Sequence, residues 1–135
     1  MLKPNIVVIH EARSEAAVNI SCKRNLLTLI EAQAAFLCIS PEAQAKRLLE
    51  EACVEFQART LSESPYRVLD TYKRDLESIE ESDIVDIQIS LARSAEAIMN
   101  LTGAAYGIST SDLASRYLAA TLFASDHTKQ HSRRV

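Results

Sequence analysis

The sequence predicts a mainly α-helical fold with one short two-stranded antiparallel ribbon, built from two similar halves of a single chain. Three observations lead to this prediction. The chain has 135 residues but only two Gly and three Pro, a composition that favours helices. Residues 18–54 align without a gap on residues 87–123, an offset of 69 positions. In both halves, a stretch that alternates apolar and polar residues precedes a helical periodicity.

The repeat is supported by nine identities in 37 aligned positions and by an apolar pattern that stays in register throughout. The identical pairs are Ile20/Ile89, Ser21/Ser90, Arg24/Arg93, Ala35/Ala104, Ile39/Ile108, Ser40/Ser109, Ala45/Ala114, Arg47/Arg116 and Leu49/Leu118. A solenoid of 34-residue helical repeats is the competing prediction. An offset of 34 gives no comparable match, however, and the alternating stretches have no place in an all-helical solenoid.

The repeat divides the chain into five segments. We expect an N-terminal arm over residues 1–16, a first repeat over 17–60, a linker over 61–84, a second repeat over 85–125 and a basic tail over 126–135. Two repeats in one chain allow their strands to pair with each other, which predicts a monomer that mimics a dimer.

Each repeat is expected to open with a half-buried strand, because side chains of a strand alternate between its two faces. The residues expected to face the core are Val18, Ile20 and Cys22, with Val85, Ile87 and Ile89. The residues expected to face outward are Ala17, Asn19 and Ser21, with Asp86, Gln88 and Ser90.

A first helix follows each strand. Its predicted apolar face is Leu26, Leu29, Ile30, Gln33 and Leu37 in the first repeat, and Ala95, Ile98, Met99, Thr102 and Tyr106 in the second. The helix is expected to end at Cys38 and at Gly107. Gly107 suits a left-handed C-cap better than Cys38 does.

A second helix is expected to start after the N-cap residues Ser40 and Ser109, with Pro41 at its first position and Asp112 completing a capping box. Its predicted apolar face is Ala45, Leu48, Leu49, Ala52, Cys53 and Phe56, and in the second repeat Ala114, Tyr117, Leu118, Thr121 and Leu122. In the linker, the apolar spacing predicts an amphipathic helix over Tyr66–Glu80.

The charge is unevenly distributed. The net charge is −3, but the first 60 residues carry seven basic and seven acidic side chains. Residues 61–83 carry three basic and seven acidic side chains, a balance of −4, and residues 84–135 carry five and four, a balance of +1. The whole-chain charge is therefore a poor guide to the surface of either repeat.

The pattern gives no support to catalysis or to metal binding. The three cysteines Cys22, Cys38 and Cys53 have no metal-ligand spacing and occupy apolar positions, so we expect buried, reduced thiols. No nucleophile elbow, phosphate-binding glycine loop or zinc-protease motif is present. We expect a protein without cofactor or metal that is not an enzyme. No apolar segment is long enough to cross a bilayer and no signal peptide is evident, which favours a cytoplasmic protein.

The order strand, short helix, Ile-Ser turn and longer helix resembles the ribbon-helix-helix family of DNA-binding proteins. The resemblance covers residues 17–56 and 86–123. Because two such motifs lie in one chain, the sequence is most similar to the tandem, TraY-like accessory proteins of conjugation and T-DNA transfer. The resemblance implies double-stranded DNA as partner, a relaxosome or other DNA-processing protein as a further partner, and plasmid transfer or transcription regulation as the role.

The resemblance also implies which residues contact DNA. The outward residues of the ribbon expected to contact bases are Asn19, Ser21, Gln88 and Ser90, since Asn and Gln can each pair with adenine and Ser with several bases. The residues expected to contact phosphates, at the strand ends and the helix N-termini, are Lys23, Arg24, Ser40, Arg93, Ser109 and Thr110. Asp86 departs from the pattern of a strong DNA binder, because it would repel phosphate.

Two other functions stay open. A ribbon-helix-helix antitoxin would carry a partner-binding tail, and the last dozen residues lack the apolar pattern for one. A helical adaptor that binds protein rather than DNA is favoured by Asp86 and by the acidic linker.

Overall fold

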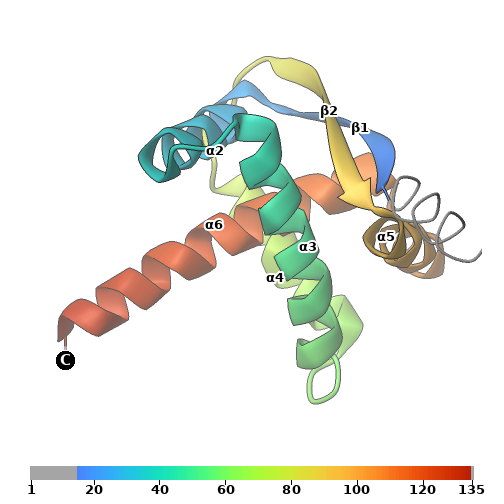
Figure 1. Ribbon diagram of the computed structural model, residues 1–135. Helices are drawn as coiled ribbons and strands as arrows, with labels where there is room; N and C mark the ends of the chain where they lie inside the picture. The colour runs from blue at the N-terminus through green and yellow to red at the C-terminus, as the bar shows by residue number, and fades with distance from the viewer. Residues whose placement is uncertain (1–14, 135) are drawn as a thin grey trace, which may run out of the picture.

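The computed structural model describes residues 15–134, with side chains described from residue 15 to residue 124. This part of the chain forms two strands and five helices (Figure 1). In chain order they are β1 (Glu15–Lys23), α2 (Arg24–Leu37), α3 (Pro41–Arg59), α4 (Pro65–Glu77), β2 (Ile84–Ala92), α5 (Arg93–Tyr106) and α6 (Thr110–Arg134). The predicted fold class, mainly helical with a two-stranded antiparallel ribbon, is confirmed.

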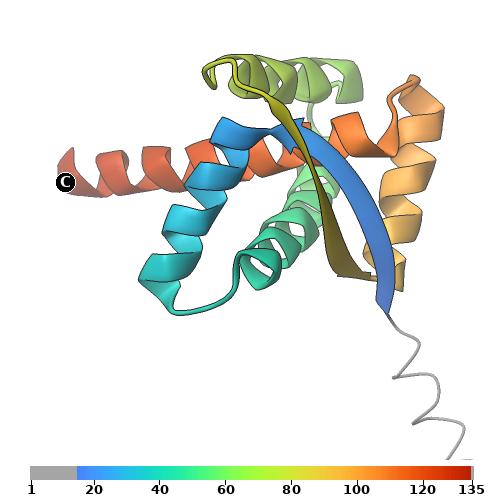
Figure 2. The same cartoon turned by 90° about the horizontal axis from the view of Figure 1, so that it is seen from above.

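The two strands pair with each other along their whole length. The register runs from Glu15 opposite Ala92 to Lys23 opposite Ile84, which places Asn19 opposite Gln88 at the centre. Viewed from above, the ribbon lies across the helices, which form the layer beneath it (Figure 2). The predicted alternation is also confirmed, because the odd-numbered residues of β1 from Glu15 to Ser21 and the even-numbered residues of β2 from Ile84 to Ser90 are exposed.

Equivalent elements in the two halves begin at the same offset. The differences between their first residues are 84 − 15, 93 − 24 and 110 − 41, each equal to 69. The order strand, helix, helix therefore occurs twice, and α4 lies in the connection between the two occurrences, residues 60–83.

The core lies under the ribbon, where α6 packs against β1 and α3 packs against β2. Leu49 of α3 and Leu118 of α6, an identical pair in the sequence repeat, are both fully buried. The ring of Phe56 lies 5.9 Å from that of Tyr117 and 6.4 Å from that of Tyr72 in α4, so α4 shares this core. The predicted apolar face of α3 is confirmed at all six positions, and that of α6 at every position except the half-buried Thr121.

The predicted face of the first helix is partly wrong. The buried residues of α2 are Leu26, Ile30 and Ala34, whereas Leu29 and Leu37 are exposed. In α5 they are Ala95, Met99 and Gly103. The buried stripe on each short helix is thus narrow, because only one side meets the core and the small residue in its last turn allows close approach.

The predicted helix caps are confirmed with one correction. Ser40 Oγ accepts a hydrogen bond from Ala43 N at 3.0 Å, and Ser109 Oγ accepts one from Asp112 N at 3.1 Å. The carboxylate of Asp112 does not complete a capping box, since it pairs with Arg116 at 2.9 Å. Arg116 lies one turn further along the helix, and its guanidinium binds a carboxylate more strongly than a backbone N–H does.

Cys38 is a second correction, because it is exposed and not buried as predicted. It stands at the C-cap of α2 with a left-handed φ of 59°, and its equivalent Gly107 has a φ of 69°. This conformation turns the chain away from the helix, so the residue that adopts it leaves the core. Cys22 and Cys53 are buried as predicted.

Some boundaries differ from the predicted ones. The strand β1 begins at Glu15 rather than at residue 17, and α4 ends at Glu77 rather than at residue 80. The helix α6 continues to Arg134, through most of the segment expected to form a basic tail.

A substitution in the shared core tests whether the two halves fold as one unit. Leu49→Ala should lower the free energy of unfolding by about 2–5 kcal/mol, because it leaves a cavity at a fully buried site. The matched control is Leu101→Ala in α5, whose side chain is 71% exposed, and its effect should stay within about 0.5 kcal/mol. Urea unfolding followed by circular dichroism should show one transition, and two separate transitions would contradict a common core.

Candidate nucleic-acid interface

The centre of the ribbon's outer face is formed by two amide side chains. Asn19 and Gln88 lie opposite each other in the pairing register, and both are exposed. Among the described residues neither amide has a hydrogen-bond partner, so their donors and acceptors face outward. The structure thus brings together two of the four residues expected to contact bases.

The other two predicted base-contacting residues are engaged within the ribbon. Ser21 Oγ donates a hydrogen bond to the carboxylate of Asp86, its cross-strand neighbour. Ser90 Oγ donates one to Glu15 Oε1 at 3.0 Å. Each hydroxyl proton therefore points to a carboxylate, which leaves only the oxygen lone pairs of these serines to accept hydrogen bonds from outside.

One end of the ribbon is fixed to α3 by charged groups. Glu50 Oε2 accepts a hydrogen bond from the backbone N–H of Ala92 at 3.0 Å, and Lys46 Nζ lies 2.9 Å from the same oxygen. Lys46 also pairs with Glu15 across 3.4 Å. Burial favours a raised pKa for Glu50, but the Ala92 N–H and the Lys46 ammonium together hold its pKa below the usual value. The carboxylate is thus kept charged where the edge of β2 needs an acceptor.

The edge of β1 is covered by α6. The backbone N–H of Ser21 donates to Ser111 Oγ at 2.7 Å, and the hydroxyls of Ser111 and Ser115 donate to the Ser21 carbonyl at 3.3 and 3.4 Å. A two-stranded ribbon has two free edges, and their backbone groups need partners. Serines at the start of α6 supply them for β1, as Glu50 does for β2.

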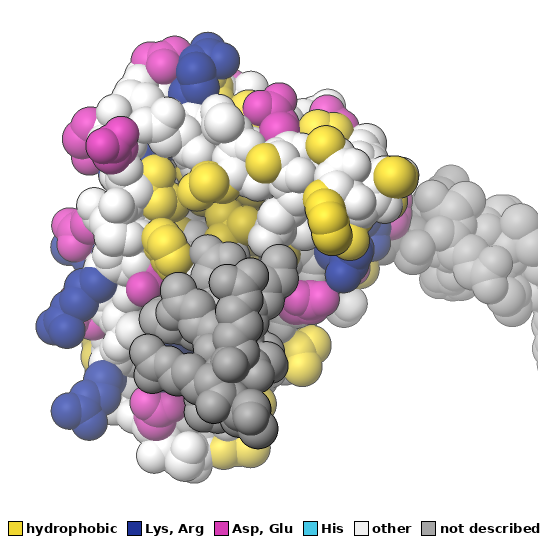
Figure 3. Space-filling view, turned by 90° about the vertical axis from the view of Figure 1, so that its left-hand side faces the viewer, with side chains coloured by type: hydrophobic (Ala, Val, Ile, Leu, Met, Phe, Trp, Pro, Cys, Tyr) yellow, Lys and Arg dark blue, Asp and Glu magenta, His cyan; other side chains and the backbone are white. Residues whose placement is uncertain are grey.

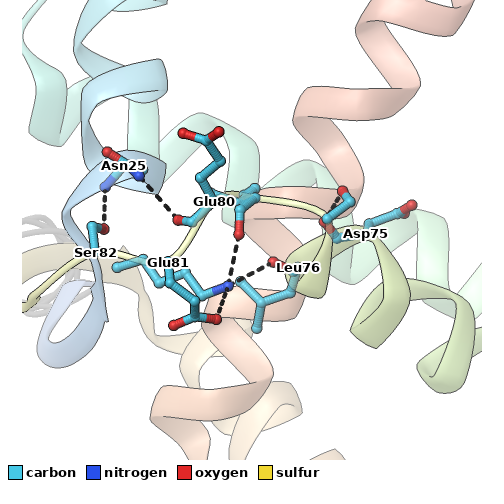
Figure 4. Close-up of polar contacts among 9 residues, drawn as sticks. Asn25, Asp75, Leu76, Glu80, Glu81 and Ser82 are labelled. Atoms are coloured by element: carbon cyan, nitrogen blue, oxygen red, sulfur yellow. Dashed lines mark hydrogen bonds and ion pairs between the residues drawn. The ribbon is translucent and has the colours of Figure 1, made fainter.

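Lys23, a predicted phosphate contact, is committed to the connection between the halves. Its ammonium donates to Leu76 O at 3.3 Å and to Ile79 O at 2.9 Å, and pairs with Glu81 at 3.1 Å (Figure 4). The side chain of Lys23 is only 13% exposed. A cation at the C-terminal end of α4 is also favoured by the helix dipole. Lys23 therefore anchors the connection in this structure.

The start of α2 holds the rest of the connection. The backbone N–H of Asn25 donates to Ser82 Oγ and its side-chain amide to Glu80 O, both at 3.0 Å (Figure 4). Arg24 N donates to Asp83 O at 2.9 Å, and the Arg24 guanidinium pairs with the Asp83 carboxylate at 3.0 Å. The connection thus runs along the first half and meets the beginning of β2 at the end of the ribbon opposite to Glu50.

The remaining predicted phosphate contacts lie at helix starts. Arg93 is the exposed first residue of α5. Ser40 and Ser109 are N-caps whose hydroxyls are engaged by their own helices. Thr110 Oγ1 donates to Asn100 Oδ1 at 2.8 Å. The amides of Thr110 and Ser111 have no acceptor inside the helix, whereas the corresponding residues of α3 are Pro41, which has no N–H, and Glu42, which is acidic.

The side chains that fix the ribbon were not predicted from the sequence. Glu50 and Ser111 each contact a strand residue, and Asp83 contacts Arg24 at the start of α2; in every case the partner is at least 42 positions away. Ser111 was noted only as a hydroxyl at a helix start, and the periodicities that predict strands and helices carry no information about such pairs.

The buried thiols are weakly acidic. Burial, aided by Glu50, raises the pKa of Cys53 to about 11, and burial with Asp86 raises that of Cys22. Both thiols are therefore protonated at neutral pH. Across the described residues, no group of three or more His, Cys, Asp and Glu side chains is placed to hold a metal ion.

No single helix in the described part of the chain is long and apolar enough to span a membrane. The pair α2 and α3 passes that test together, but with a bend of 104° between its members. Comparisons of the chain with protein-family models, with curated proteins and with solved structures found no match.

Acid titration tests whether the Glu50 carboxylate stabilises the end of the ribbon through its contacts with Ala92 and Lys46. Its pKa is lower in the folded protein than in the unfolded chain, where it is about 4.3. The charged form therefore stabilises the fold above that value, and this contribution is lost as the pH falls through the folded-state pKa. Glu50→Gln should cost about 1 kcal/mol at pH 7 and progressively less below pH 4. Urea unfolding of both proteins at several pH values measures this difference in the free energy of unfolding. Glu55→Gln, at an exposed position of the same helix, should have no such pH-dependent effect.

Lys23→Ala tests the anchoring of the connection. The variant should lose about 1–3 kcal/mol of stability, because two carbonyls and one carboxylate lose their charged partner. Lys73→Ala, which removes an exposed lysine from α4, is the control and should leave stability unchanged. Thermal unfolding measures both. Equal stabilities of the two variants would show that Lys23 has no anchoring role.

Proposed function

We propose that this protein binds double-stranded DNA and reads the major groove with the β1–β2 ribbon. The single observation that carries the proposal is the pairing of the two strands around Asn19 and Gln88, with an exposed polar face on one side and the helical core on the other. A two-stranded ribbon fits the major groove, where amide side chains can form bidentate pairs with adenine.

The arrangement we propose is a tandem ribbon-helix-helix pseudo-dimer. Its support is the twofold order of strand, helix and helix at a constant offset of 69 residues, together with the pairing of the strands from the two halves. An isolated half would leave a strand unpaired and an apolar face uncovered. In this proposal one chain supplies both halves, so it binds DNA as a monomer.

The dimensions of the outer face suit a short recognition site. Three cross-strand pairs face outward between Ala17 and Ser21, which are four residues apart. At about 3.3 Å per residue this span is about 13 Å, or roughly four base-pair steps. Two contacts to adenine at the centre would be flanked on one side by Asp86, a carboxylate whose usual base partner is the amino group of cytosine. The preferred site is therefore not a perfect palindrome.

Charge limits the strength of binding. The outer face carries the carboxylates of Glu15 and Asp86, and Lys23 is held by the connection. Backbone contacts then depend on Arg24, Arg93 and the start of α6. With few phosphate contacts, we expect modest affinity that falls with added salt. An accessory role in conjugative or T-DNA transfer, or repression of transcription, accords with such binding.

A helical adaptor that binds protein is the second candidate, and the exposed apolar residues of α2 favour it. The side chain of Phe36 is 85% exposed, with Leu29 and Leu37 also exposed on the same helix. Figure 3, which faces the side of the molecule where α2 lies, shows apolar side chains gathered at the surface. An adaptor would bind no duplex, so the DNA titration described next separates the two functions.

Substitution of the central amides tests the proposal. Asn19→Ala and Gln88→Ala should each reduce discrimination between preferred and unrelated duplexes by about 1–3 kcal/mol, the value of one bidentate pair. Gln57→Ala removes an exposed amide from α3 and should change nothing. Fluorescence anisotropy with a pool of labelled duplexes at 50 and 200 mM salt provides the measurement. Absence of binding to every duplex at 50 mM salt would overturn the DNA-binding proposal.

A further inference from the structure

Arg24 and Asp83 form an ion pair at one end of the ribbon. Arg24 directly follows β1 and Asp83 directly precedes β2. The Arg24 Nε–H donates to both oxygens of the Asp83 carboxylate, at 3.1 and 3.0 Å. The pair thus lies at the end of the ribbon, where a ribbon bound in the major groove would approach the DNA backbone.

Both members of this pair are accessible to an anion. Their side chains are 57% and 63% exposed. Exposed ion pairs are weak because water competes with each partner. A guanidinium binds phosphate with the same charge-assisted geometry that it uses for a carboxylate. A phosphate group can therefore replace the Asp83 carboxylate on Arg24.

The connection does not depend on this side-chain pair for its position. The backbone N–H of Arg24 donates to the carbonyl of Asp83, and Asn25 and Lys23 hold the neighbouring residues. The Arg24 guanidinium can thus turn from the carboxylate to a phosphate while the backbone of the connection stays in place. Lys23 differs, because it is largely buried among three acceptors.

The acidic member of the pair is not repeated in the sequence. Arg93 is the equivalent of Arg24, but the residue 69 positions before Asp83 is Ser14, which carries no charge and lies outside the described residues. The carboxylate of Asp83 therefore belongs to the connection and is not a feature common to both repeats.

We propose that Asp83 competes with the DNA backbone for Arg24, so that the connection weakens DNA binding by the first half of the chain. This inference rests on the proposed DNA-binding function. In it, Asp83 substitutes for a phosphate in the free protein, and DNA must displace it before the first half contributes its arginine.

The test compares two variants of the connection that remove the same charge. Asp83→Asn removes the carboxylate that holds Arg24. Glu80→Gln removes a carboxylate three residues earlier that has no ion-pair partner among the described residues, and Figure 4 shows it directed away from the Glu81 carboxylate. Both variants gain the same net charge, so a difference between them reports the release of Arg24 and not a general electrostatic effect.

The measurement is anisotropy titration of one labelled duplex between 50 and 200 mM salt, for the unchanged protein and both variants. Asp83→Asn should bind about three- to tenfold more tightly than Glu80→Gln at 50 mM salt. Its plot of log affinity against log salt should be steeper by about 0.9, the value of one additional phosphate contact. In an Arg24→Ala background, Asp83→Asn should bind no better than Glu80→Gln.

The outcomes separate this inference from the proposed function. If the unchanged protein binds and the two variants bind equally, the competition is disproved and DNA binding stands. If an advantage of Asp83→Asn persists in the Arg24→Ala background, Arg24 is not the residue released and the inference is also overturned. If neither the unchanged protein nor any variant binds any duplex of the pool used to test the proposed function, DNA binding itself is wrong and the inference is overturned as well.

Discussion

The structure depends on the pairing of β1 with β2. A strand without a neighbour exposes backbone donors and acceptors. The centres of β1 and β2 are 69 residues apart, so the two strands are not joined by a short hairpin turn. Each strand therefore depends on a partner from the other half of the chain. This constraint explains why α3, α4 and α6 share one core beneath the ribbon. It also explains why the free edges are covered by Glu50 and Ser111, side chains from the helices that carry the core.

The two ends of the ribbon are fixed by different chemistry. At the Glu15 end, α3 supplies a lysine and a glutamate that bind both strands. At the other end the acidic connection is held by the start of α2. The sequence repeat is thus symmetric in its elements and core but asymmetric in its charged contacts. If the ribbon reads DNA, this asymmetry acts on the backbone contacts before any base is recognised.

The features that depend on local periodicity were predicted correctly. The alternating strands, the serine caps, the left-handed turns at Cys38 and Gly107 and the buried face of α3 all follow from short-range patterns. The prediction failed where burial depends on which side of a short helix meets its neighbours. Leu29 and Leu37 are apolar and correctly spaced, yet both are exposed, because the core reaches only the stripe of Leu26, Ile30 and Ala34.

The sequence by itself determined the twofold order of strand and helices, the outward position of Asn19 and Gln88 and the acidic character of the connection, since each depends on residues near one another in the chain. Only the tertiary structure decided the partners of the charged groups. Lys23 and Arg24 are basic residues at a strand end by sequence, but in the fold the connection brings carbonyls and carboxylates to them. The reason is physical: a charge binds whichever opposite charge the fold places within about 4 Å, and sequence distance does not set that separation.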